Sequence, residues 1–273
     1  MSAADHINPD ASLWHWLAFD LRRYRQARKQ SVTEVGRVMG VARTSVSNFE
    51  AMRRRPDVDH LKRLDAAWRT GGHFLRLLTF ARLNHDPNWF KEHLFYEARA
   101  RMLRIFEPLI IPGLLQTEDY ARLAIVAEAG GASEKTEADL KLRMDRQGLL
   151  TRKDPPRLHV LLDEGVLDRP VGGPDIMRRQ LARLLEVSEL PNIVLRVRPR
   201  SAGYHVGLMG AFKIMTCAPE GEVAYTEAAE GGRLVLDGTG VARFVTRFDD
   251  IGAECLSRSA SREMLKRAME AMR

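Results

Sequence analysis

The stretch SVTEVGRVMGVARTSVSNFE, residues 31–50, decides the fold of the N-terminal part of this chain. Ser31 and Glu34 have the spacing of a capping box, in which each side chain accepts from the other residue's amide, so a helix is predicted to begin here. Gly40 can adopt the left-handed conformation that ends this helix, and a second short helix is predicted over 42–51. Two short helices joined by a glycine-containing turn are typical of a helix-turn-helix.

The spacing inside this stretch supports the same motif. Counted from Val32, apolar residues occupy the fourth, eighth, tenth, fifteenth and eighteenth places, where the two helices must bury side chains. Glycine occupies the fifth place, where the helices approach closely, and the ninth place, which is the turn. These seven residues are Val35, Gly36, Met39, Gly40, Val41, Val46 and Phe49. Seven demands met together indicate a helix-turn-helix strongly.

The positive charge of the chain is confined to its first third. The net charge is +7, and residues 1–85 contain 15 Lys+Arg against 8 Asp+Glu, whereas the remainder contains 28 of each. Clusters at 22–29 and 53–55 contribute most of the excess. A basic head on a neutral body is typical of a module that meets a polyanion. Solvated surface arginines are the alternative explanation, and a membrane surface would require one continuous basic amphipathic helix.

Residues 22–57 resemble the lambda-repressor-type helix-turn-helix of the XRE transcriptional regulators. The resemblance implies five helices. The first is predicted over 12–28, Leu61, Leu64 and Trp68 fall in the fourth, and Phe74 falls in the fifth. It therefore implies a helical DNA-binding head over 12–84, with residues 42–50 as the helix that enters the major groove.

The same resemblance implies which side chains meet DNA. Arg43 suits guanine O6 and N7, and Asn48 suits adenine N6 and N7. The outward side chains of the recognition helix are Arg43, Thr44, Ser45, Ser47 and Asn48. Side chains better placed for phosphates are Thr33, Arg37, Arg53, Arg54 and Arg55. We expect Glu50 to pair with an arginine of the first helix such as Arg25, because a free carboxylate near phosphates is repelled.

Three departures from the XRE pattern predict weak or assisted DNA binding. Val32 stands where many members have a phosphate-clamping Gln, and Ala51-Met52 stands where a Gly is common. Ala42 replaces the usual Ser cap, at a cost of about 1 kcal/mol in helix stability.

Residues 87–273 are predicted to form an α+β body with a small sheet, which makes the chain mainly α overall. A helix from 88 is expected to continue past Met102, and an extended apolar segment covers 106–116. Helices follow from Thr117 and from Ser133. Strands are predicted over 158–162, 193–197, 211–216, 223–226 and 233–236, and further helices over 174–189, 241–256 and 259–272.

The body resembles the C-terminal region of the actinobacterial WhiJ-type, antitoxin-like regulators in segments 106–125, 149–181 and 201–215, with Val206 in place of a frequent Pro. This resemblance implies a small acidic-to-neutral partner protein encoded beside the chain. A small ligand is the alternative, and the sequence does not choose between them. The candidate contact residues are Trp89, Tyr120 and His205, the last because it sits in a Gly-rich loop.

No pattern in the sequence predicts an enzyme. HExxH, CxxC, GxSxG and phosphate-loop motifs are absent, and the histidines lack metal-ligand spacing, so neither a metal nor a cofactor is expected. Asp163-Glu164 is more simply a solvated turn or helix start than a catalytic pair. Cys217 and Cys255 are expected to be buried thiols in a reducing cytoplasm. No membrane span or secretory signal is predicted.

The sequence therefore predicts a cytoplasmic, nucleoid-associated transcriptional regulator that binds double-stranded DNA in a sequence-specific manner and acts as a homodimer. Its body would sense a partner protein or a ligand. The alternative is an antitoxin-like partner-binding protein in which DNA binding is secondary.

Overall fold

The structure is a computed structural model and describes residues 7–83, 89–228 and 231–272. The chain divides into two compact units, residues 1–89 and 90–273. Each unit has its own hydrophobic core, and each is described by itself.

The head contains five helices around one core. Helices α1 (Leu13–Ala27), α2 (Val32–Met39), α3 (Arg43–Glu50), α4 (Val58–Trp68) and α5 (His73–Leu83) follow one another with short connections. Each contributes buried side chains at helical spacing. The largest fully buried side chains of this core are those of Leu17, Leu21, Met39, Phe49, Leu61, Leu64 and Phe74. The five helices implied by the sequence are therefore present.

The body is built on a six-stranded mixed sheet of order β3-β2-β1-β4-β5-β6. Strands β1 (Ala100–Glu107), β2 (Arg157–Asp163) and β3 (Ile193–Arg198) are parallel. Strands β4 (Phe212–Cys217), β5 (Gly221–Ala228) and β6 (Gly231–Val235) continue from β1 as an antiparallel meander. The α+β body with a sheet is confirmed, and the five predicted strands are all present.

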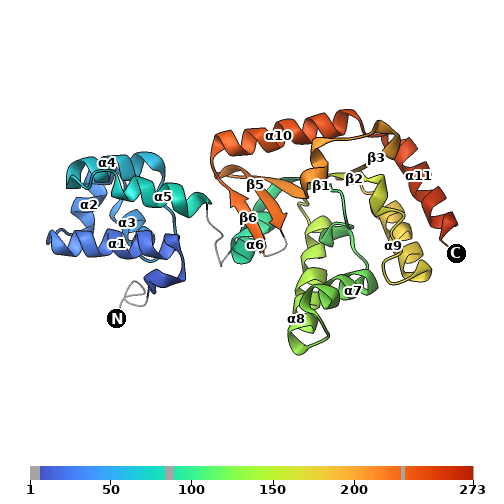
Figure 1. Cartoon of the computed structure of the whole chain (residues 1–273), viewed down its shortest axis with the longest axis horizontal. Helices are drawn as coiled ribbons and strands as arrows, with labels where there is room; N and C mark the ends of the chain where they lie inside the picture. The colour runs from blue at the N-terminus through green and yellow to red at the C-terminus, as the bar shows by residue number, and fades with distance from the viewer. Residues whose placement is uncertain (1–6, 84–88, 229–230, 273) are drawn as a thin grey trace. The chain divides into compact units, whose positions relative to one another are not determined.

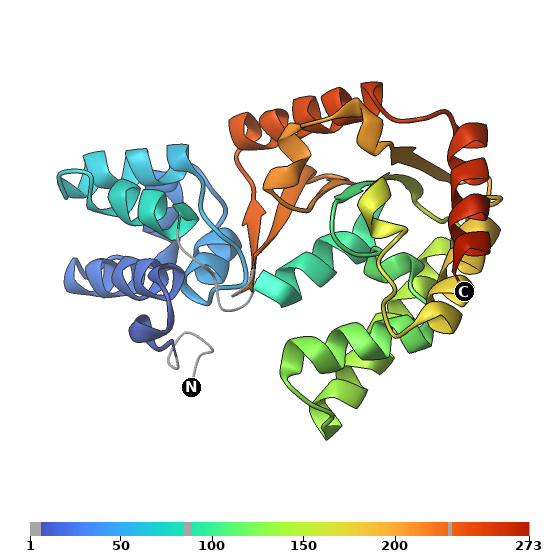
Figure 2. The ribbon, with the colours of Figure 1, turned by 45° about the vertical axis from the view of Figure 1, so that its right-hand side comes forward.

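Helices cover both faces of this sheet. The crossover from β1 to β2 contains α7 (Glu118–Ala129) and α8 (Glu134–Arg146), and the crossover from β2 to β3 contains α9 (Pro174–Val187). These helices lie on one face, whereas α10 (Gly238–Ala253) runs along the other (Figures 1 and 2). Helix α11 (Arg258–Ala271) packs against α9 and β3.

One prediction for the body is wrong. The helix expected to continue past Met102 is α6 (Trp89–Arg99), which ends before the strand β1 begins at Ala100. Strand β1 is hydrogen-bonded on both sides, with Ile105 opposite Val160 of β2 and Lys213 of β4. Pairing with two partners distant in sequence outweighs the local helix preference of this segment.

A smaller difference concerns α8. The helix predicted from Ser133 ends as an α-helix at Arg146, and residues 147–150 form one 3₁₀ turn that places Leu150 in the core.

Candidate nucleic-acid interface

The turn between α2 and α3 is fixed by the residues that the sequence singles out. The Ser31 hydroxyl accepts from the Glu34 amide at 3.2 Å, and the Glu34 carboxylate accepts from the Ser31 amide at 2.6 Å. Gly40 has φ of +74°, the left-handed region that favours glycine. A Cβ on Gly36 would lie 2.8 Å from the Val41 carbonyl oxygen, so the close approach of the two helices requires glycine there.

Helix α3 presents one face to the core and the other to solvent. Val46 and Phe49 are buried, which fixes the rotation of the helix about its axis. Its remaining side chains lie on the outer face, where Arg43, Thr44 and Ser47 are exposed and Ser45 and Asn48 are half-buried. The structure therefore brings together on one helix face the five outward side chains, four of which, all but Ser47, we predict to read bases.

Glu50, the single acidic residue of α3, is tied to α1. Its carboxylate accepts two hydrogen bonds from the Arg25 guanidinium, at 2.6 Å from Nε and 2.8 Å from Nη2. The carboxylate side chain is 5% exposed, and its hydrogen bonds raise the pKa of Arg25. The pair expected from the sequence is thus present, and it removes the negative charge of α3 from the outer surface.

The basic cluster after α3 divides into two roles. Arg53 and Arg54 are exposed, and their amides donate to the Asn48 carbonyl, which holds them at the C-terminal end of α3. Arg55 is instead half-buried, with its guanidinium carbon 4.0 Å from the centre of the Trp14 ring. A cation packed over an aromatic face joins the segment to α1. Arg53 and Arg54 are the better-placed phosphate contacts, and Arg55 has a structural contact that the sequence pattern did not reveal.

The remaining head residues lie where the sequence placed them. Thr33 and Arg37 are exposed on α2, and Val32 is half-buried at its first position. Ala42 makes no side-chain capping bond at the start of α3. The N-cap position of the predicted recognition helix therefore lacks a side-chain acceptor for the amides of its first turn.

The three candidate contact residues of the body have different environments. Trp89 is half-buried at the first position of α6. Tyr120 is 1% exposed, and its hydroxyl accepts from the Ile111 amide at 3.3 Å, so it braces the chain after β1 from within the core. His205 is 7% exposed in the loop before β4. Tyr120 and His205 thus have separate neighbours and do not form one site.

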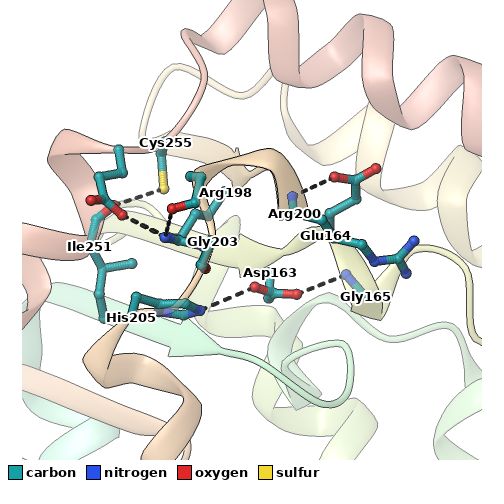
Figure 3. A network of polar contacts seen from close by, with 11 residues as sticks. Asp163, Glu164, Gly165, Arg198, Arg200, Gly203, His205, Ile251 and Cys255 are labelled. Atoms are coloured by element: carbon teal, nitrogen blue, oxygen red, sulfur yellow. Dashed lines mark hydrogen bonds and ion pairs between the residues drawn. The ribbon is translucent and has the colours of Figure 1, made fainter.

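His205 belongs to a polar network at the carboxyl ends of β2 and β3 (Figure 3). Its Nε2 lies 3.3 Å from Oδ2 of Asp163, whose other carboxylate oxygen accepts from the Gly165 amide. His205 Nδ1 has no hydrogen-bond partner among the described residues. Burial, and secondarily the charge of Arg198, lowers the pKa of His205, so the imidazole is neutral near pH 7.

Two neighbouring pairs complete this network. Arg198 is almost fully buried, and both Nε and Nη2 donate to Glu254 at the end of α10. The Glu164 carboxylate accepts from the Arg200 amide at 2.7 Å. Asp163 and Glu164 therefore start a turn, as the sequence predicts. The burial of Arg198 was missed, because nothing in the local sequence distinguishes it from a surface arginine.

None of the groups of His, Cys, Asp and Glu in residues 7–83, 89–228 and 231–272 has three members placed to hold a metal ion. Among the same residues, no helix is long and apolar enough to cross a membrane.

Comparisons with known proteins match each unit separately. A helix-turn-helix domain model matches residues 16–78, which supports DNA-binding regulation by the head. A model described as "Domain of unknown function (DUF5753)" matches residues 90–267. No match was found among curated proteins or among solved structures.

Proposed function

The chain belongs to the DUF5753 family and carries a helix-turn-helix DNA-binding domain, and we propose that it is a sequence-specific transcriptional regulator whose body senses a partner protein or a ligand. The observation that carries this proposal is the outer face of α3. It combines one arginine, one asparagine and three hydroxyls, and its single carboxylate is withdrawn into the pair with Arg25.

The proposed division of labour follows from exposure. Arg43, Thr44, Ser45 and Asn48 face outward along α3 and read base edges in the major groove. Thr33, Arg37, Arg53 and Arg54 lie beside them and hold phosphates, which position the protein without reading sequence. Arg55 supports this surface through Trp14.

The first test is fluorescence anisotropy with DNA from upstream of the protein's own gene, against scrambled DNA, at two salt concentrations. We expect Arg43→Ala to cost about 1–3 kcal/mol on the specific site and to relax specificity at one base pair. Arg76→Ala, which removes the same charge from the exposed surface of α5, is the matched control. Equal binding of both DNAs by the wild type, or wild-type discrimination in Arg43→Ala, would contradict sequence reading by α3.

A second variant separates positioning from reading. Arg54→Ala should weaken binding to all sequences alike and reduce the slope of log K against log salt by about 1. If Arg54→Ala instead changed the preference between the two DNAs, Arg54 would be a reader and the proposed division would be wrong.

We also propose that the protein acts as a homodimer on near-palindromic sites. Helix-turn-helix proteins of this kind place two recognition helices about 34 Å apart, one turn of DNA. Sedimentation of the full chain with a one-half-site and a two-half-site duplex tests this point. A stoichiometry of two chains per two-half-site duplex supports the homodimer. A stoichiometry of one chain per duplex with both DNAs contradicts it.

The uncapped start of α3 favours a second candidate function. Ala42 leaves an amide of the first turn without a side-chain acceptor, and Val32 supplies no polar group for a phosphate. In this alternative the protein is antitoxin-like and its main activity is to bind a small protein encoded beside it. Co-expression with the product of the adjacent gene distinguishes the two functions. The alternative is supported if the two proteins form a complex and the chain binds its own upstream DNA no more tightly than scrambled DNA.

We further propose that the body is not an enzyme. Asp163 and His205 form an acid–imidazole pair, but the nearby Cys255 thiol is buried and donates to the Ile251 carbonyl. Burial raises the pKa of Cys255 to about 11, so the thiolate is scarce at neutral pH. A thermal-shift screen of metabolites, with turnover measured for each hit, tests this; consumption of any hit that is lost in His205→Gln would contradict it.

A further inference from the structure

A hollow of about 270 Å³ lies between the edge strand β6 and the first turns of α10. Helix α10 packs on this part of the sheet through Val241, which belongs to the same buried cluster as Val235 of β6. Beside this apolar contact, three guanidinium groups converge on the hollow. They come from Arg233 on β6 and from Arg243 and Arg247 on α10.

Within the part of the chain that the structure describes, these cations have no carboxylate partner; Arg233 and Arg243 are exposed, and Arg247 is half-buried. Arg243 and Arg247 are four residues apart on α10, so they share a helix face and repel each other. Asp237 is the one carboxylate in the described lining, and its Oδ1 accepts from the Gly240 amide at 2.7 Å. The lining therefore has three positive charges against one negative charge.

Two arginines of the body, Arg146 and Arg198, have carboxylate partners, whereas the half-buried Arg143 and Arg196 donate to uncharged oxygens. Arg146 donates twice to Glu97, and Arg198 donates twice to Glu254. Three like charges gathered at one concave site make the local potential positive, which favours the binding of an anion there. The charge arrangement thus points to an occupant supplied from outside the chain.

The backbone around the hollow is adapted to keep it narrow. A Cβ on Gly240 would lie 2.6 Å from Cγ1 of Val235, so only glycine lets α10 approach β6 this closely. The ring of Phe244 also lines the hollow, with the Arg247 guanidinium carbon 5.5 Å from its centre. The ring orders that guanidinium and, with Val235, provides an apolar wall beside the charges.

We propose that this hollow binds a phosphorylated small molecule. Guanidinium groups bind phosphate oxygens through paired hydrogen bonds, and Arg233, Arg243 and Arg247 would surround the phosphate. Phe244 and Val235 contact the rest of the ligand. The volume of about 270 Å³ lies just below the usual range of ligand pockets, about 300 to 1,000 Å³, and so favours a small ligand such as a sugar phosphate or a mononucleotide. The inference concerns the body alone, so it stands or falls separately from DNA binding by the head.

The size and the apolar wall favour this ligand over two other polyanions. A duplex DNA backbone presents phosphates on a convex surface and has no group for Phe244 and Val235. An acidic peptide would have to place its carboxylates within the same small volume. Both remain as outcomes of the test.

Isothermal titration calorimetry on the full chain provides the test, with inorganic phosphate, ribose 5-phosphate and adenosine monophosphate as probes. Ribose and adenosine are the unphosphorylated controls. We expect at least one phosphorylated probe to bind saturably with Kd below about 1 mM, with no heat from the controls. Arg243→Gln and Arg247→Gln should each weaken that binding at least about tenfold, because each removes a charged donor. Arg267→Gln, an exposed arginine on α11, should leave it unchanged.

A second measurement avoids any dependence on how the variants fold. In the wild type, the bound probe should protect Arg243 and Arg247 from modification by phenylglyoxal, as read by mass spectrometry, while Arg267 reacts as before. Absence of binding by all three phosphorylated probes overturns the proposal. Binding without protection, or with wild-type affinity in both variants, places the phosphate elsewhere and also overturns it.

Two further experiments test whether the hollow binds an acidic protein or the DNA backbone in place of a phosphorylated small molecule. If a glutamate-rich peptide binds, the phosphorylated probes do not, and Arg243→Gln weakens the binding of the peptide, the occupant is an acidic protein partner and not a small molecule. Scrambled duplex DNA that protects Arg243 in a chain carrying Arg43→Ala and Arg54→Ala would reassign the hollow to the DNA backbone.

Discussion

Replacing Glu50 by alanine should lower the stability of the head by about 3 kcal/mol. The Glu50 and Arg25 side chains are 5% and 14% exposed, and two hydrogen bonds of 2.6 and 2.8 Å join them. Removing one partner of a buried ion pair costs about 3–5 kcal/mol, because the remaining charge is left without compensation. We expect the lower end of that range, since Arg25 keeps its hydrogen bond to the Gln30 carbonyl.

Thermal unfolding followed by tryptophan fluorescence is the assay. Three of the four tryptophans, Trp14, Trp16 and Trp68, lie in the head helices α1 and α4, and Trp89 begins α6, so the signal reports chiefly on the head. For a domain of this size, 1 kcal/mol shifts Tm by about 4–8 °C, so Glu50→Ala should melt roughly 12–24 °C lower than the wild type. Glu50→Gln, which keeps one acceptor, should lose about half as much.

The control is Asp59→Ala, which removes an exposed carboxylate from the first turn of α4. Its cost should stay below about 1 kcal/mol, the value of a surface charge near a helix N-terminus. A Glu50→Ala variant with the same Tm as Asp59→Ala would refute the reasoning. It would mean that the pair with Arg25 does not hold α3 against α1.

Three other predictions follow from single positions. Ala42→Ser should raise the free energy of unfolding of the head by about 0.5–1 kcal/mol in urea titrations, because a hydroxyl would accept from the first turn of α3. Gly36→Ala should cost about 1–3 kcal/mol in the same titrations, because its Cβ would meet the Val41 carbonyl at 2.8 Å, whereas Gly148→Ala, with nothing within 4 Å, should be neutral. Burial raises the pKa of Glu107 to about 8. Between pH 4.5 and about 8 the folded body keeps a proton that the unfolded chain has released, so the free energy of unfolding should fall as the pH rises through this range. Glu107→Gln should remove that loss, and a body that melts with the same pH dependence in both proteins would contradict the assignment.

The head was largely predictable because its signals are local. The capping box at Ser31, the left-handed Gly40 and the apolar spacing through Phe49 each depend on residues within one or two helical turns. The pair of Glu50 with Arg25 was also accessible, because a carboxylate on a DNA-facing helix requires a partner.

The features that the sequence did not reveal depend on distant contacts. Strand β1 begins directly after α6, and its Arg101 and Arg104 interrupt the alternation by which a half-buried strand is identified. Its partners lie about 55 and 110 residues further along the chain, in β2 and β4. Arg55 on Trp14 likewise depends on a tertiary contact and not on spacing.

The hollow beside α10 could not be located from the sequence for a similar reason. Arg243 and Arg247 are recognisable as neighbours on one helix face, but Arg233 joins them only when β6 pairs with β5 and α10 packs above. The glycine that permits this packing, Gly240, resembles any glycine near a helix start until the distance to Val235 is known.

The central position of β1 has a consequence for the order in which the chain folds. The head needs only contacts among residues 13–83, so it can fold as soon as those residues leave the ribosome. The sheet of the body cannot close until β4, ending at Cys217, has also emerged. At roughly 5–20 residues per second, that interval is about 7–27 s. During synthesis a folded basic head therefore precedes a body in which β1 can pair with β2 but still lacks its β4 neighbour, and this open edge of β1 is exposed to misassociation in that interval.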